Sequence, residues 1–232
     1  MTTDLNFYRV GGCVRDEILG RRSKDIDYAV EAPSFAAMEA YIAEHGRIYL
    51  SKPEFLTIRA KLDGEDRDFV LCRKDGSYSD ARHPDSVELG DIYDDLARRD
   101  FTMNAIAIRE TNGSVVDPHN GREDIENGII RTVGCADERF NEDALRLLRA
   151  MRFHFTLGFA LHADIIVCLR DHKLLSKLAS VSVDRMQAEL SKCMAKDTLG
   201  TLMFLGEFSR LREHLFGNSR LWLEPTLKER PV

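Results

Sequence analysis

A pair of glycines and a pair of aspartates near the start of the chain are suited to phosphate chemistry. Gly11-Gly12 lies between a short β-prone run, Phe7–Val10, and a stretch of helical character, Cys13–Leu19. Glycines at such a turn let backbone N–H groups face a phosphate at the start of the helix, and Arg15 can add a charged fork for the same anion. The segment therefore predicts a turn that binds a phosphate group.

Asp25 and Asp27 fall within the same 17-residue stretch, Gly11–Asp27. On the strand predicted at Ile26–Val30 the two carboxylates alternate, so both project from one face. Adjacent carboxylates repel each other unless a cation lies between them, and Mg²⁺ with triphosphate oxygens suits that geometry. The alternative is a plain glycine turn with two solvated aspartates. That alternative is favoured for either half alone, whereas the combination favours a metal-bound nucleotide.

A second cluster, Arg98–Ala105, places two arginines beside an acid. It is either a surface ion-pair cluster or a source of guanidinium groups for a polyphosphate, for which Arg99 is the candidate. Asn104 either contacts a sugar hydroxyl or caps a turn. The residues alone leave both questions open.

A third cluster repeats charged residues at three-residue steps along a predicted helix: Asp143, Arg146, Arg149 and Arg152. Such residues are neighbours on a helix, so they form either a stripe of exposed ion pairs or a recognition surface. An Asp–Arg pair can read a base edge, because Asp143 would accept from an exocyclic amine and Arg146 would donate to a ring nitrogen. Cytosine and adenine offer that pattern and uracil and guanine reverse it, so the pair would select C and A together.

The elements that must position these residues change character along the chain. Up to about residue 132, short strands alternate with helices. A helix is expected at Phe35–His45, and further strands are expected at Ile48–Leu50, Leu56–Leu62 and Asp68–Leu71, with a hairpin at Asp63-Gly64. A long polar loop is predicted at Arg73–Gly90, and helical spacing resumes at Leu96–Ile108.

From residue 133 on, apolar residues recur at helical spacing and no strand pattern remains. Helices are expected at Glu138–Phe155, Ala163–His172, Val183–Met194 and Thr198–Glu213, with Ser182 or Asp197 as N-caps. The predicted fold class is therefore an α/β part followed by an all-α part, divided as residues 1–132, 133–200 and 201–232. Residues 224–232 are expected to form a frayed tail.

Composition sets limits on the class of protein. The 232 residues include 33 basic and 39 acidic side chains, and a formal net charge of −6 argues against non-specific nucleic-acid binding by bulk charge. The charge is uneven, −8 over residues 1–132 and +2 over the rest. No membrane span and no export signal are expected, and five scattered cysteines fit a reducing cytoplasm without a zinc site or a disulfide framework.

Taken together, these segments resemble the class II tRNA nucleotidyltransferases (CCA-adding enzymes) and the related bacterial poly(A) polymerases. Five motifs stand in the family's order between residues 7 and 190: Gly11–Asp27, Arg98–Ala105, Asp117–Gly121, Glu142–Arg152 and Ser182–Leu190. The resemblance implies a polymerase-β-like nucleotidyltransferase head, a mixed sheet with flanking helices, followed by a helical neck. Residues 201–232 would be a short helical remnant and tail.

The resemblance also implies roles for the residues of these motifs. Asp25 and Asp27 would be the catalytic and metal-binding residues, holding Mg²⁺ while a primer 3′-hydroxyl attacks the α-phosphate of CTP or ATP. The nucleotide-binding residues would be Gly12, Arg15, Arg99, Asn104, Asp143, Arg146, Arg149 and Arg152, with Asp143 and Arg146 selecting the base. The loop Arg73–Gly90, with Tyr78 and Arg82-His83-Pro84, resembles the family's flexible loop that helps to switch from C to A addition.

The chain also departs from the family. Only about 40 residues follow the last motif, where full-length members continue into helical domains that grip the tRNA. A truncated chain, a natural minimal enzyme and a head that depends on a second subunit or a homo-oligomer all explain this. The expected partners are CTP, ATP and a tRNA 3′ end, with no membrane. CCA addition is favoured, and an A-adding enzyme, a poly(A) polymerase and a nucleotide-binding component of a split enzyme are the alternatives.

Overall fold

The computed structural model describes residues 5–23, 25–76, 86–217 and 221. Its first half is built on a mixed seven-stranded sheet in the order β3-β4-β5-β2-β1-β8-β9. The strands are β1 Asn6–Val10, β2 Ile26–Glu31, β3 Arg47–Lys52, β4 Thr57–Leu62, β5 Glu65–Leu71, β8 Ala107–Arg109 and β9 Val115–Val116. β2 and β5 run parallel and the other neighbouring strands run antiparallel. The α/β head is therefore confirmed, including the hairpin at Asp63-Gly64, where both residues have positive φ.

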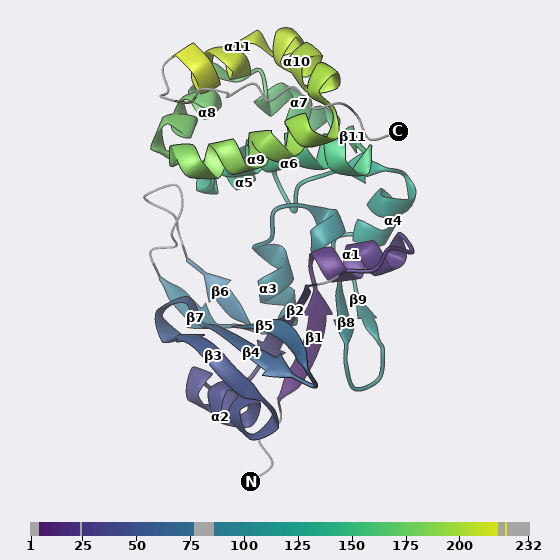
Figure 1. Ribbon diagram of the computed structural model, residues 1–232, viewed down its shortest axis with the longest axis vertical. Coiled ribbons are helices and arrows are strands. Elements are labelled where there is room, and N and C mark those ends of the chain that lie inside the picture. Colours follow the sequence, from purple (N-terminus) through teal and green to yellow (C-terminus); the bar gives the residue numbers. More distant parts are fainter. Residues whose placement is uncertain (1–4, 24, 77–85, 218–220, 222–232) are drawn as a thin grey trace.

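Helices cover the two faces of this sheet unequally. On one face, α2 (Phe35–His45) packs Met38 and Ile42 against Ile58 and Phe69. On the other face, α3 (Ile92–Ala97) packs Ile92 and Leu96 over the centre of the sheet. Figure 1 shows α2 on the side away from the helical half of the chain and α3 on the side that faces it.

The second half is helical, as expected. Its helices are α5 Ala136–Glu142, α6 Leu145–Leu157, α7 Ala163–Cys168, α8 His172–Ser176, α9 Val183–Lys196, α10 Thr198–Glu207 and α11 Ser209–Arg212. The head meets this half through α1 (Gly12–Ile18), a 3₁₀ turn at Thr102–Asn104 and α4 (Gly121–Glu126), which lie at the top of the sheet in Figure 1.

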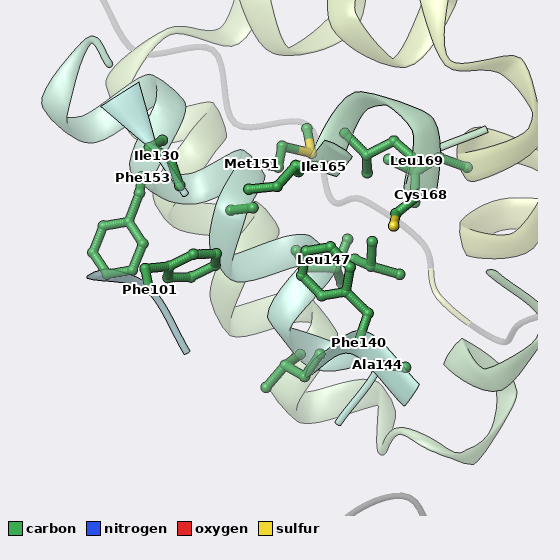
Figure 2. Close-up of a cluster of buried hydrophobic side chains, with 14 of the residues drawn as sticks. Phe101, Ile130, Phe140, Ala144, Leu147, Met151, Phe153, Ile165, Cys168 and Leu169 are labelled. Atoms are coloured by element: carbon green, nitrogen blue, oxygen red, sulfur yellow. The ribbon is translucent and has the colours of Figure 1, made fainter. Parts of the chain in front are cut away.

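One hydrophobic core crosses from the head into the helical half. Phe101 and Ile130 of the head pack in one cluster with Leu147, Met151 and Phe153 of α6, and Figure 2 shows these side chains together. The change at residue 132 is thus a change in the type of element within continuous packing. The division into residues 1–132, 133–200 and 201–232 is our proposal for the domain organisation.

The helix expected at Leu96–Ile108 is wrong. The chain forms α3 earlier, from Ile92, then the 3₁₀ turn, then β8. An Asp91 capping box starts α3, and its side chain accepts from the Asp94 N–H. Residues 101–107 are all buried, the polar Thr102 and Asn104 included, so the spacing of apolar residues there does not distinguish a helix from a turn followed by a strand.

The helix expected at Glu138–Phe155 is two helices. Asp143 has extended φ and ψ angles of −148° and 106° and separates α5 from α6. Its carboxylate accepts the Leu145 N–H at 2.9 Å, which stabilises the start of α6. Asp143 therefore does not share a helix with Arg146, and the predicted four-residue stripe is wrong.

The helical half differs from the expected elements in further, smaller ways. Ala160–Leu161 forms a short strand, β11, parallel to β10 (Ile129–Ile130), although no strand was expected beyond Val133. The expected helix Ala163–His172 divides into α7 and α8, and Thr198–Glu213 divides into α10 and α11. Asp197 caps α10 by accepting the Gly200 N–H, whereas Ser182 begins α9 without a side-chain cap.

The expected loop Arg73–Gly90 begins and ends in short strands. Its ends pair as β6 (Arg73–Asp75) and β7 (Val87–Leu89). Residues 77–85, which include Tyr78 and Arg82-His83-Pro84, and residues 222–232, which include the expected tail, lie outside the described residues.

Candidate active site

At the turn after β1, side chains of other segments lie close to the backbone. Gly11 has φ of 74°, which favours glycine, and a Cβ added there would lie 3.2 Å from the Arg99 Nη1 and 3.6 Å from an Asp27 carboxylate oxygen. Two of the sequence-predicted clusters therefore meet at this turn. Gly12 follows as the first residue of α1, and a Cβ there would lie 3.5 Å from an Arg15 guanidinium nitrogen.

The carboxylates form a row across the sheet. Asp27 pairs with Val10 of β1 on one side and with Asp68 of β5 on the other. Directly paired residues share a face of a sheet, so Asp27 and Asp68 project on the same side. Asp25 precedes β2 by one residue and is exposed. Asp68 is a third carboxylate that the sequence did not single out, because only the parallel pairing of β2 with β5 brings it there.

Asp27 lies in an environment that opposes its charge. Burial raises the pKa of Asp27 above its ordinary value, the negative charges of Asp68 and Asp25 add to this, and Arg99 acts in the opposite direction. Asp68 pairs with Arg59 of β4, whose Nε lies 3.1 Å from Oδ1. A hard cation would relieve the charge repulsion that raises the pKa of Asp27, and carboxylate oxygens are ligands that suit Mg²⁺.

Arg99 is fixed by a buried acid that the sequence did not identify. The Asp95 side chain is fully buried, and its Oδ2 accepts from the Arg99 Nε at 3.1 Å and Nη2 at 2.8 Å, while its Oδ1 accepts from Arg98. Burial alone would raise the pKa of Asp95, but the two guanidinium groups outweigh it and hold that pKa below its ordinary value. The two arginines are therefore not a surface ion-pair cluster.

A chain of hydrogen bonds connects the glycine turn with the helical half. Arg15 donates to the Asn104 side-chain oxygen at 2.8 Å, and Asn104 donates to Asp100 Oδ1 at 3.1 Å. The Arg149 Nε of α6 donates to Asp100 Oδ2 at 2.7 Å. Burial alone would raise the pKa of Asp100, but Arg149 and the hydrogen bonds from Asn104 and Phe101 lower it below its ordinary value. Asn104 is thus buried within this network.

Asp143 and Arg146, which are expected to read the base, form hydrogen bonds with different residues. Asp143 Oδ2 accepts from Arg185 of α9 at 3.1 Å. Arg146 donates to Glu142 at 2.7 Å, and to the Arg139 and Arg98 carbonyl oxygens at 3.1 Å each. Both side chains are thus oriented by other elements and do not pair with each other.

Arg152 pairs with Glu189 of α9, whose side chain is 9% exposed. Arg185 and Glu189 both belong to the segment Ser182–Leu190, to which the sequence assigned no individual roles. The structure shows what that motif contacts: it supports Asp143 and Arg152, a connection between distant segments that the motif spacing alone could not reveal.

The described residues hold no preformed metal cluster and no membrane-spanning helix. No group of three or more His, Cys, Asp or Glu side chains there is arranged to hold a metal ion by itself, so Asp25, Asp27 and Asp68 would supply only part of a coordination shell. No helix in the described part of the chain is long and apolar enough to cross a membrane.

The mixed sheet carries a glycine turn, a row of carboxylates and converging arginines, and it is joined to a helical half, which is the arrangement expected of a polymerase head domain. Residues 7–131 match the family described as the poly A polymerase head domain. The chain belongs to that family.

Proteins of known activity resemble the chain over most of its length. The CCA-adding enzyme of Geobacillus kaustophilus (strain HTA426) is 41% identical over 195 residues, which cover 81% of this chain and 45% of the relative. That of Geobacillus thermodenitrificans (strain NG80-2) is 42% identical with the same coverage. The chain thus spans about half the length of the curated relatives it matches.

Solved structures agree in fold. The Bacillus stearothermophilus CCA-adding enzyme in complex with CTP has a TM-score of 0.75 and 36% identity, covering 88% of this chain and 48% of that one. The Thermotoga maritima CCA-adding enzyme complexed with tRNA-CCA has a TM-score of 0.76 and 27% identity, covering 96% of this chain and 50% of that one.

Proposed function

We propose that the chain is the head and neck of a template-independent nucleotidyltransferase that adds CMP and AMP from CTP and ATP to the 3′ end of tRNA. The observation that carries this proposal is the convergence of Gly11, Asp27 and Arg99 next to the network that ends at Arg149. The CTP and tRNA-CCA complexes of similar proteins support the choice of substrates.

In this mechanism the chain contributes mainly position and charge. Asp25, Asp27 and Asp68 would hold Mg²⁺, which when bound stabilises charge on the triphosphate and activates the primer hydroxyl. Arg99, fixed by Asp95, and Arg15, fixed by Asn104, would contact the triphosphate, with Gly12 leaving room for it. The in-line attack of the primer 3′-hydroxyl on the α-phosphate, which breaks the bond to the β-phosphate oxygen and releases pyrophosphate, then needs no nucleophilic side chain.

Asp143 and Arg146 would read the base. Within the described residues, three of the five N–H groups of Arg146 donate to Glu142, Arg139 and Arg98, which leaves Nε and one Nη2 hydrogen to donate to a ring nitrogen. Asp143 retains acceptor capacity beyond its bonds to Leu145 and Arg185. Arg149 and Arg152 would support the sugar or phosphate.

The direct test is incorporation from single and mixed nucleoside triphosphates, with Mg²⁺, into tRNA ending before CCA, after C or after CC. Stepwise addition of C, C and A is the expected result. Addition of A only to the CC-ended tRNA would instead indicate an A-adding enzyme, and long A tails on unrelated RNA a poly(A) polymerase.

A nucleotide-binding component of a split enzyme is the second candidate, because the chain spans about half of its relatives. It would bind CTP without extending any RNA until a second subunit is supplied. Calorimetric CTP binding, run beside the incorporation assay, separates the two. A homo-oligomer or second subunit that grips the tRNA, and a cytoplasmic location consistent with five unpaired cysteines, belong to the same proposal.

Arg146→Ala is expected to relax base choice, because the donor that meets the ring nitrogen is lost while the metal-binding residues remain. Discrimination of CTP over UTP, measured as the ratio of kcat/KM values, should fall by roughly tenfold or more. Arg122→Ala, at an exposed arginine of α4, is the matched control and should retain selectivity. Strict selection of C and A by the Arg146 variant would contradict the role of this side chain.

A further inference from the structure

On the active-site face of the sheet, β3, β4 and β5 carry exposed side chains among the described residues, and this part of the sheet is here called the open face. Strands β3, β4 and β5 bury Ile58, Ala60 and Phe69 under α2 on one face. Their other face carries Asp68 and lies beyond α3, whose apolar residues pack over the central strands. In Figure 1 these strands lie between α2 and the helical half.

Cations and an aromatic ring line this open face. Arg59 pairs directly with Asp68, and Lys61 lies two residues along β4, on the same side of the sheet. Arg47 of β3 pairs with Lys61. These three residues and Tyr49 are here called the open-face strip. All four are exposed, and Tyr49 is 53% exposed.

Tyr49 lies where β3 bulges between Ile48 and Leu50. Its hydroxyl is within electrostatic reach of the open face: slight desolvation and the charges of Asp66 and Asp68 raise its pKa, while Arg59 opposes them. An exposed tyrosine ring among arginine and lysine side chains is the combination that binds single-stranded nucleic acid, since bases stack on the ring and phosphates pair with the cations.

The strip is continuous with the carboxylates. The Arg59 Nε lies 3.1 Å from Asp68 Oδ1, and Asp68 pairs with Asp27. From β5 to β3 is two strand spacings, roughly 10 Å. The first 132 residues carry a net charge of −8, so most of the head repels RNA and a local cationic strip favours one approach.

We propose that the open-face strip binds the last unpaired nucleotides of the RNA primer and directs its 3′-hydroxyl to Asp27 and Asp68. A terminal base stacks on Tyr49, and Arg59, Lys61 and Arg47 neutralise the phosphates. The identity of the primer as an RNA 3′ end rests on the proposed function.

The test measures binding separately from turnover. Fluorescence anisotropy with a labelled single-stranded RNA ending in CC gives the Kd of the full chain over a range of salt concentrations. Tyr49→Ala should weaken binding roughly tenfold, the effect of losing one stacked base. Lys61→Gln should lower the slope of log K against log salt by about 0.7, the effect of losing one phosphate contact to a single strand.

Matched controls are available on other surfaces of the chain. Tyr93→Ala removes a tyrosine of α3 that is 57% exposed, and Lys192→Gln removes an exposed lysine of α9. Both should bind the RNA as the unaltered chain does. Equal losses in the control variants would overturn the proposal, because they would show that binding is not specific to the strip.

Kinetics supply a second, independent readout. For Tyr49→Ala and Lys61→Gln the KM for the primer should rise while the KM for CTP stays unchanged. A rise in the CTP KM with unaltered RNA affinity would place the strip at the nucleotide and contradict the proposal. If the unaltered chain extends no RNA, the proposed function fails, and the anisotropy result still decides whether the strip binds a single strand.

Discussion

Asp27→Asn is expected to abolish nucleotide incorporation and leave the fold intact. The side chain keeps its size, but the row formed by Asp27 and Asp68 loses one negative charge and one Mg²⁺ ligand. The rate should fall at least about a thousandfold, the scale seen when a group that stabilises charge in phosphoryl transfer is removed. Single-turnover incorporation of labelled CMP measures it.

Stability separates a loss of metal binding from a loss of structure. Because burial and neighbouring carboxylates raise the pKa of Asp27, its ionised form is unfavourable in the folded protein, and the Asn variant should be at least as stable as the unaltered chain without metal. Mg²⁺ should raise the Tm of the unaltered chain more than that of the variant. Asp66→Asn, on the same face of β5, is the matched control and should remain active. Near-normal incorporation by Asp27→Asn would refute the assignment.

The second large effect is expected for Arg149→Ala, at the contact between head and neck. The variant leaves the Asp100 carboxylate buried without its guanidinium partner. The free energy of unfolding should fall by about 2–3 kcal/mol, towards the low end for a broken buried pair because the Arg149 side chain is 35% exposed. Urea denaturation at neutral pH measures it, and incorporation should fall as well because the network to Arg15 is broken.

The pH dependence of stability tests whether the lost Arg149–Asp100 ion pair causes the destabilisation of Arg149→Ala. The folded-state pKa of Asp100 lies below its ordinary value, so the stability from this pair is present above about pH 4 and is lost as the pH falls further. The difference between the variant and the unaltered chain should therefore shrink on acidification. Glu207→Ala breaks an exposed pair with Arg170 and should cost under about 1 kcal/mol. A destabilisation of Arg149→Ala that does not change with pH would rule out the charge pair as its source.

The local sequence pattern predicted much of the secondary structure of the head. The helix at Phe35–His45 forms with the expected bounds, because Ser34 caps it by accepting the Ala37 N–H and Gly46 follows its last residue. The strand at β2 and the hairpin at Asp63-Gly64 also follow from local preference. In these segments, backbone propensity and burial favour the same structure.

The spacing of apolar residues predicted the wrong secondary structure where several elements bury the same segment. Within Leu96–Ile108, residues 101–107 are all buried, the polar Thr102 and Asn104 included, so the spacing of apolar residues there does not indicate a helix. At Asp143 a side chain that caps the next helix interrupted an otherwise continuous helical pattern. The helical stripe of Asp143, Arg146, Arg149 and Arg152 depended on that continuity.

The sequence by itself determined the chemical groups of the site and the order of the elements. Glycines, carboxylates and arginines are recognisable by residue type. Residues close in sequence, such as Asp25 and Asp27, must also lie close in space. Only the tertiary structure decided which distant groups meet: Asp68 beside Asp27, Asp95 beneath Arg99, and Arg149 against Asp100. Strand order and helix packing bring these pairs together, and both depend on long-range contacts that no local spacing records.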